Sequence, residues 1–149
     1  FFVIAYSFLL KEDFNIKNDH ILNIAVMIKT NYKNSDKEIF AMGDMAGKTS
    51  YLLDKKLIQL EGLVSGKKMI NNIKNEKNLC KVLKELNVDV YLASKIKYEN
   101  NKIFLEEPSI SSQNAKKMKG EINIKPNKIF NSGNINIYAF ESNKNNACF

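Results

Sequence analysis

The stretch from Glu38 to Ser94 alternates short apolar runs with amphipathic segments, and this alternation restricts the fold more than any other feature. The predicted strands are EIFAMG (Glu38–Gly43), KLIQLEG (Lys56–Gly62) and VDVYLAS (Val88–Ser94). The predicted helices between them are KTSYLLD (Lys48–Asp54), KKMINNIK and NEKNLCKVLKELN. Because parallel neighbouring strands need a crossover helix, this order predicts a parallel βαβαβ sheet with helices packed against it.

The segments on either side extend this prediction. Asn18 or Asp19 can cap a helix whose apolar residues recur at helical spacing. This stripe consists of Ile21, Ile24, Ala25, Ile28 and Tyr32. Downstream, KIFLEE is a predicted fourth strand, Pro108–Glu121 a loop, and Lys128–Glu141 a hairpin around Asn131-Ser132-Gly133-Asn134. The predicted fold is α/β, a small mostly parallel sheet with flanking helices and a C-terminal β-hairpin.

The first ten residues, FFVIAYSFLL, are almost entirely apolar and stop at Lys11-Glu12-Asp13. Ten helical residues span about 15 Å, roughly half of a bilayer core. We interpret Phe1–Leu10 as the end of a transmembrane helix; the alternative is a buried strand or helix of a soluble fold. The predicted organisation is therefore a membrane segment (1–10), a link (11–17), one extracytoplasmic α/β domain (18–141) and a flexible tail (142–149).

The charge of the chain does not by itself indicate a nucleic-acid partner. The formal net charge is +7, but all 23 basic residues are lysine. Arginine makes the bidentate contacts with phosphate and guanine that specific nucleic-acid recognition favours. We therefore expect no nucleic-acid partner.

Few residues are available for metal or covalent chemistry. The two cysteines, Cys80 and Cys148, predict neither a disulfide framework nor a metal site, and Cys80 lies in a helical segment as a small buried side chain would. His20 is the single histidine. We expect no catalytic residue, no metal and no cofactor in this chain.

The segment GDMAGKTS resembles a phosphate-binding loop in composition but not in spacing. That loop has four residues between its first glycine and its Gly-Lys-Thr, whereas three separate Gly43 from Gly47. Asp44 would also place a negative charge among the phosphates. Gly43 and Gly47 are better interpreted as a structural turn between strand and helix, with Asp44 capping that helix.

Taken together, IFAMGDMAGKTSYLLDKKLIQLEGLV, LKELNVDVYLAS and IFNSGNINIYAF resemble the C-terminal extracytoplasmic domain of bacterial polytopic GT-C glycosyltransferases, in the protein O-mannosyltransferase and aminoarabinose transferase superfamily. The shared features are a glycine-acid-x-x-glycine turn (Gly43, Asp44, Gly47), Tyr51, and a strand running into Glu61-Gly62-Leu63-Val64. The similarity covers about residues 18–140. It implies a domain outside the inner membrane of an enzyme that uses a polyprenyl-phosphate-linked sugar, with the catalytic acid elsewhere in the full protein.

The residues proposed to lie near substrate are Asp44, Glu61 and Gly62, because the carboxyl ends of strands in open α/β sheets are where ligands bind. The alternative is that Asp44 caps a helix and Glu61 is solvated. The expected partners are membrane lipid, the polyprenyl-phosphate sugar, and a glycan or protein acceptor. Lysines of the two central helices would contact anionic headgroups or form a solvated face: Lys67, Lys68, Lys74, Lys77, Lys81 and Lys84.

Two other functions remain open from the sequence. The first is a membrane-anchored binding module for a glycan or protein without enzyme activity. The second is a small nucleotide-binding protein that depends on Lys48 and Thr49, which the loop spacing disfavours.

Overall fold

The structure is a computed structural model that describes residues 19–61, 66–109, 112, 114–142 and 148. Within those residues no helix is both long enough and apolar enough to cross a membrane. The predicted membrane segment (Phe1–Leu10), the link that follows it, and Gly62 of the predicted site lie outside the described residues.

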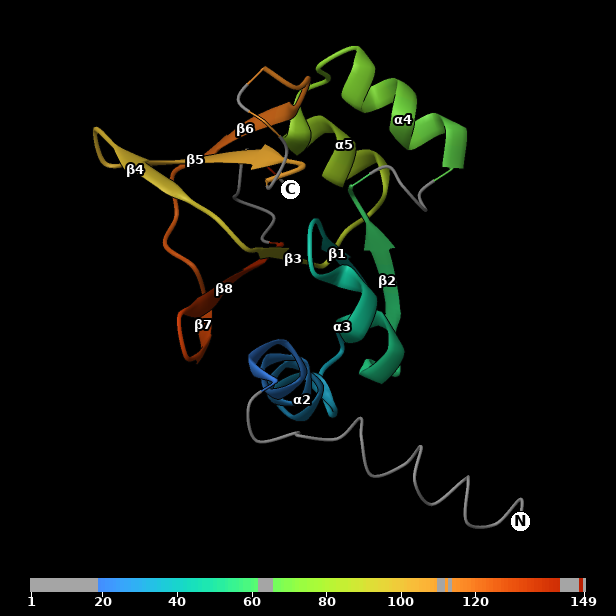
Figure 1. Cartoon of the computed structure of the whole chain (residues 1–149), viewed down its shortest axis with the longest axis vertical. Helices are drawn as coiled ribbons and strands as arrows, with labels where there is room; N and C mark the ends of the chain where they lie inside the picture. Colours follow the sequence, from blue (N-terminus) through green and yellow to red (C-terminus); the bar gives the residue numbers. More distant parts are fainter. Residues whose placement is uncertain (1–18, 62–65, 110–111, 113, 143–147, 149) are drawn as a thin grey trace, which may run out of the picture.

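The described chain is a mixed α/β domain with four helices (Figure 1). In chain order the elements are α2 (His20–Tyr32), β1 (Ile39–Met42), α3 (Ala46–Leu52), β2 (Lys56–Gln59), α4 (Gly66–Lys74), α5 (Leu79–Glu85), β3 (Val90–Ala93), β4 (Lys97–Glu99), β5 (Lys102–Glu107), β6 (Met118–Ile122), β7 (Lys128–Ser132) and β8 (Ile135–Glu141). The strands and helices expected between Glu38 and Ser94 are therefore present.

The central sheet has five strands in the order β2-β1-β3-β8-β7. β1 pairs in parallel with both β2 and β3, as the βαβαβ pattern predicts. β8 then pairs antiparallel with β3, and β7 antiparallel with β8. The expectation of a mostly parallel sheet is wrong, because the predicted C-terminal hairpin joins this sheet beside β3 and makes it mixed.

A second sheet of three antiparallel strands, in the order β4-β5-β6, extends from the end of β3. The predicted fourth strand is β5, but it belongs to this sheet. The prediction of a loop from Pro108 to Glu121 is wrong over its last part, because Met118–Ile122 forms β6. Its buried residues alternate with exposed ones, a period-two pattern hidden among lysines and a glycine.

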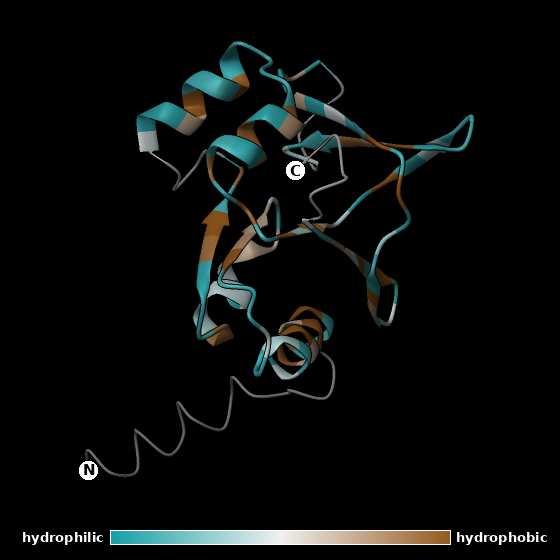
Figure 2. Cartoon of the chain, turned by 180° about the vertical axis from the view of Figure 1, so that it is seen from behind, coloured by the Kyte–Doolittle hydropathy of each residue, from teal (hydrophilic) through white to brown (hydrophobic). Residues whose placement is uncertain are grey.

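Helices α2 and α3 cover one face of the central sheet. Asp19 caps α2 by accepting a hydrogen bond from the backbone N–H of Leu22 at 3.0 Å. Four residues of the predicted stripe are buried against the sheet: Ile24, Ala25, Ile28 and Tyr32. Ile24, Ile28 and Tyr32 pack with side chains that β1, β3, β7 and β8 direct to this face, and α2 presents an apolar stripe there (Figure 2).

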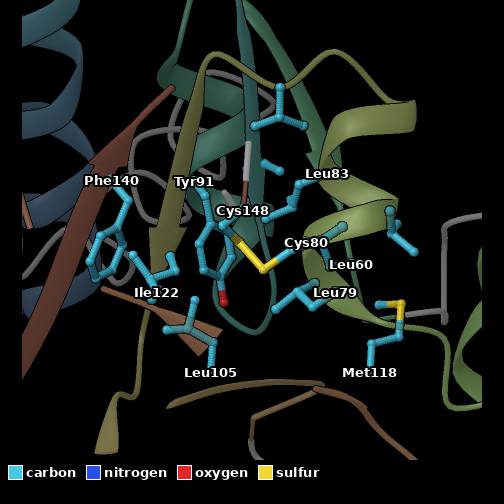
Figure 3. Packing of buried hydrophobic residues seen from close by; sticks show 14 of the residues in the cluster. Leu60, Leu79, Cys80, Leu83, Tyr91, Leu105, Met118, Ile122, Phe140 and Cys148 are labelled. Carbon is cyan, nitrogen blue, oxygen red and sulfur yellow. A yellow bond between two sulfur atoms is a disulfide. The ribbon is translucent and has the colours of Figure 1, made fainter. Parts of the chain in front are cut away.

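The opposite face carries α4, α5 and the second sheet. Ala41 of β1, Tyr91 of β3 and Phe140 of β8 point to this side and pack with Leu79 and Leu83 of α5. Leu105 of β5 and Met118 and Ile122 of β6 complete the cluster (Figure 3). The central sheet is thus buried on both faces.

Cys80 of α5 and Cys148 form a disulfide across this second core (Figure 3). The expectation that the two cysteines make no disulfide is wrong. Their 68-residue separation gave no local signal, and the fold brings their Cα atoms to 4.5 Å. Cys148, predicted to lie in a flexible tail, is only 1% exposed; residues 143–147 and 149 are outside the described part of the chain.

Candidate functional site

The carboxyl ends of β1 and β2 bring the two predicted acids to the same edge of the sheet. Met42 and Gln59 are paired in the parallel register, and Asp44 and Glu61 each follow two residues later. The negative charge of Asp44 contributes to raising the pKa of Glu61, after the larger effect of partial burial. The predicted juxtaposition of these acids is therefore present.

A third acid, Glu107, reaches this edge from the end of β5. Its side chain is 1% exposed, and its Oε1 accepts a hydrogen bond from the Tyr91 hydroxyl at 2.7 Å. We call Asp44, Glu61 and Glu107 the acidic edge. Sequence reasoning missed Glu107, although it lies in the inward period-two register of Ile103 and Leu105.

Gly43 allows the Glu107 carboxyl group to approach the backbone after β1. A Cβ atom at position 43 would lie 1.8 Å from Oε2 of Glu107. Gly47, the other glycine of the predicted turn, lies in α3, and a Cβ there would meet nothing within 4 Å. The close approach of the Glu107 carboxyl group to the backbone therefore requires glycine at position 43, whereas no contact requires glycine at position 47.

Two serines extend the polar surface of the acidic edge. The Ser109 hydroxyl donates to Oδ2 of Asp44 at 2.7 Å, and the hydroxyls of Ser94 and Ser109 are 2.7 Å apart. The prediction that Asp44 is the N-cap of the helix is wrong. The N-cap of α3 is Met45, which makes no side-chain capping hydrogen bond. Met45 instead has a left-handed backbone, with φ 74°.

Burial is the main cause of the unusual ionisation of Glu107. It raises the pKa of this carboxyl group to about 8, and the charges of Asp44 and Glu61 act in the same direction. The hydrogen bond from Tyr91 opposes this shift, and the pKa of the Tyr91 hydroxyl is itself raised by burial. Glu107 is consequently protonated at neutral pH, so the acidic edge does not carry three full negative charges.

The chemistry of the acidic edge suits a ligand with hydroxyl or amino groups. Carboxylate oxygens accept hydrogen bonds, and serine hydroxyls both donate and accept them. The same charges repel phosphate. Among the described residues no group of three histidines, cysteines or acids is placed to hold a metal ion.

The residues of the nucleotide hypothesis do not converge on a phosphate site. Lys48 forms an ion pair with Asp19 at the start of α2, and Thr49 is buried in α3. The loop before α3 contains the acid Asp44, to which the Ser109 hydroxyl donates a hydrogen bond.

A cavity of about 400 Å³ lies elsewhere, between β2, α4 and α5, and its lining includes Ile58, Met69 and Val82. It shares no residue with the acidic edge. We assign the candidate site to the acidic edge because polar and ionisable side chains from four strands converge there.

No protein family, curated protein or solved structure gives a match to this chain.

Proposed function

We propose that this chain is the C-terminal extracytoplasmic domain of an integral membrane glycosyltransferase that uses a polyprenyl-phosphate-linked sugar. The domain itself is accessory and non-catalytic. The proposal starts from the resemblance of the β1–β2 segment and the β7–β8 hairpin to such domains. Phe1–Leu10 would be the end of the last membrane helix, and the domain would lie on the periplasmic side of the inner membrane.

The Cys80–Cys148 disulfide is the observation that supports the proposed periplasmic location of the domain. Disulfides persist in oxidising compartments outside the cytoplasm and are rare in the cytosol, where thiols are kept reduced. Both cysteines are buried, so the bond is part of the core and not an exposed reactive pair. This supports a domain that folds beyond the inner membrane.

The acidic edge supports contact with the acceptor in preference to the donor. A polyprenyl-phosphate donor carries negative charge, which Asp44 and Glu61 would repel. The hydroxyl groups of a glycan acceptor would instead donate to these carboxylates. The accessory role we propose is therefore to hold the acceptor near the membrane-embedded catalytic centre.

The test uses the full-length enzyme reconstituted in proteoliposomes, with Asp44→Asn and Glu61→Gln compared against Asp36→Asn, an exposed acid before β1. Loss of a charged hydrogen-bond partner costs about 1.5–3 kcal/mol, so KM for the acceptor should rise about tenfold or more. KM for the donor and kcat should stay near the wild-type values.

Unchanged acceptor KM in both site variants would remove the acidic edge from the proposal. Glycan binding by a full-length protein without transferase activity would instead favour the membrane-anchored binding module. Glycan binding measured beside the kinetics thus separates the two functions.

A further inference from the structure

The outer surface of α2 and α3 exposes large apolar side chains that the fold does not use. Val26 and Met27 of α2 are 50% and 40% exposed, and Tyr51 of α3 is 88% exposed. Their neighbours Ala25 and Thr49 are buried, so each helix has one face in the core and an apolar part of the other face in solvent. We call Val26, Met27 and Tyr51 the α2–α3 face.

Two ion pairs locate these side chains relative to each other. Lys48 of α3 pairs with Asp19 at the start of α2, and Lys29 near the end of α2 pairs with Asp54 at 2.8 Å. Val26 lies on the helical row between Asp19 and Lys29, and Tyr51 lies between Lys48 of α3 and Asp54, which follows the end of α3. Both apolar side chains therefore flank the same helix–helix seam, with an ion pair at each end.

The same face is where the chain enters the domain. Asp19 caps α2, and residues 11–18, eight positions, connect it to the apolar segment Phe1–Leu10. Eight extended residues reach at most about 28 Å. If Phe1–Leu10 ends a membrane helix, as the proposed function holds, the start of α2 cannot be far from the bilayer surface.

We propose that the α2–α3 face rests on the surface of a lipid bilayer. This inference depends on the proposed function for its membrane anchor. Tyrosine is enriched at the membrane–water interface because its ring is apolar and its hydroxyl is polar. Val26 and Met27 supply apolar area, and because Lys29 and Lys48 beside them are each paired with an aspartate, the contact depends on apolar side chains and not on net charge.

This orientation excludes the central-helix lysines as the contact with the same bilayer. They belong to α4, α5 and the turn between these helices, on the other side of the central sheet from α2. Figure 1 shows α2 and α4 at opposite ends of the domain. A rigid domain cannot place both surfaces on one planar membrane.

These 149 residues contain no tryptophan, and with every tryptophan elsewhere in the full-length protein replaced by phenylalanine, a single introduced indole reports on one place. Tyr51→Trp marks the α2–α3 face. Ile70→Trp marks α4, and Tyr98→Trp marks the β4–β5 hairpin; both native side chains are exposed. Each full-length variant is reconstituted in vesicles of phosphatidylethanolamine and phosphatidylglycerol with or without brominated acyl chains, which quench indoles in contact with lipid.

We expect brominated lipid to reduce the emission of Tyr51→Trp by at least about twofold, with a blue-shifted maximum, and to leave the other two variants unquenched. Adding Val26→Glu and Met27→Glu to Tyr51→Trp should abolish most of this quenching. Far-UV circular dichroism of each variant reports whether the fold is retained.

Quenching of Ile70→Trp without quenching of Tyr51→Trp would overturn this inference and keep the membrane anchor. Shielding of the Tyr51→Trp indole from aqueous acrylamide without lipid quenching would also overturn it, because a protein, such as a second copy, would then cover the face. Failure of the wild-type chain to remain with the vesicles would overturn the anchor and this inference together.

Discussion

The two faces of the central sheet are covered by cores that depend on different kinds of interaction. On the α2–α3 side the core is aliphatic and aromatic, with the rings of Tyr32 and Phe40 in an edge-on contact at 5.1 Å between centroids. On the α4–α5 side the core includes a disulfide and the buried pair Tyr91–Glu107. One face depends on packing, whereas the other also depends on oxidation and on the protonation of a carboxyl group.

This difference means that the environment should act on the two sides unequally. Apolar packing does not titrate and does not respond to reductant. A buried acid responds to a change of pH, and a disulfide responds to reductant. The following substitutions are arranged to break or sharpen this comparison, from the largest expected effect to the smallest.

Cys148→Ser should lower the free energy of unfolding by about 4 kcal/mol, because the 68-residue separation of Cys80 and Cys148 lets the bond restrict the unfolded chain strongly. Urea unfolding with and without reductant measures the effect. The wild-type chain should lose a similar amount when reduced, and Cys148→Ser should lose nothing further.

Phe40→Ala is the control on the other face. It should cost a comparable few kcal/mol through the cavity it leaves, equally in oxidising and reducing buffer relative to the matching wild type. A wild-type chain whose stability does not change on reduction would contradict the contrast between the faces.

Glu107→Gln should remove a pH dependence of stability. With a folded pKa of about 8 and a lower unfolded value, Glu107 keeps its proton in the folded state while the unfolded chain loses it. Its contribution is fully present below the unfolded pKa and is lost as pH rises towards 8. The wild-type chain should therefore lose on the order of 3 kcal/mol between pH 5 and pH 8 from this group.

The glutamine variant retains an oxygen that accepts from Tyr91, so its stability should be flatter over this range. Urea unfolding at pH 5, 6, 7 and 8 checks the slopes. Glu121→Gln, a change at an exposed acid of β6, should leave the wild-type slope in place. Equal slopes for Glu107→Gln and wild type would show that Glu107 is ionised in the folded chain.

Gly43→Ala should cost about 2 kcal/mol, since the new methyl group would occupy the position of the Glu107 carboxyl group and force it to move. Thermal or urea unfolding measures the loss. The cost should shrink when Glu107→Ala is also present, because the clashing group is then removed.

Gly47→Ala is the matched control. Its Cβ meets no atom within 4 Å and it lies in α3, so the helix should become slightly more stable, by up to about 1 kcal/mol. Additive costs for Gly43→Ala and Glu107→Ala would mean that the two residues do not compete for the same space.

About half of the candidate site was predictable. Asp44 and Glu61 follow strands whose apolar runs are visible in the sequence, and a parallel pairing places them at one edge. Glu107 was not found, because its strand was predicted without a neighbouring strand and nothing near Pro108 indicates that the chain returns to β1. The serine contact to Asp44 was missed for the same reason.

The sequence by itself determined the elements whose signal is local. The stripe of α2, the runs of β1, β2 and β3 and the turn between β7 and β8 each depend on residues within a few positions of one another. Only the tertiary structure decided that β8 joins β3, that β4, β5 and β6 form their own sheet, that Cys80 meets Cys148, and that Glu107 lies against Gly43. These contacts join distant parts of the chain, and they form because the complete core buries more surface than any local arrangement does.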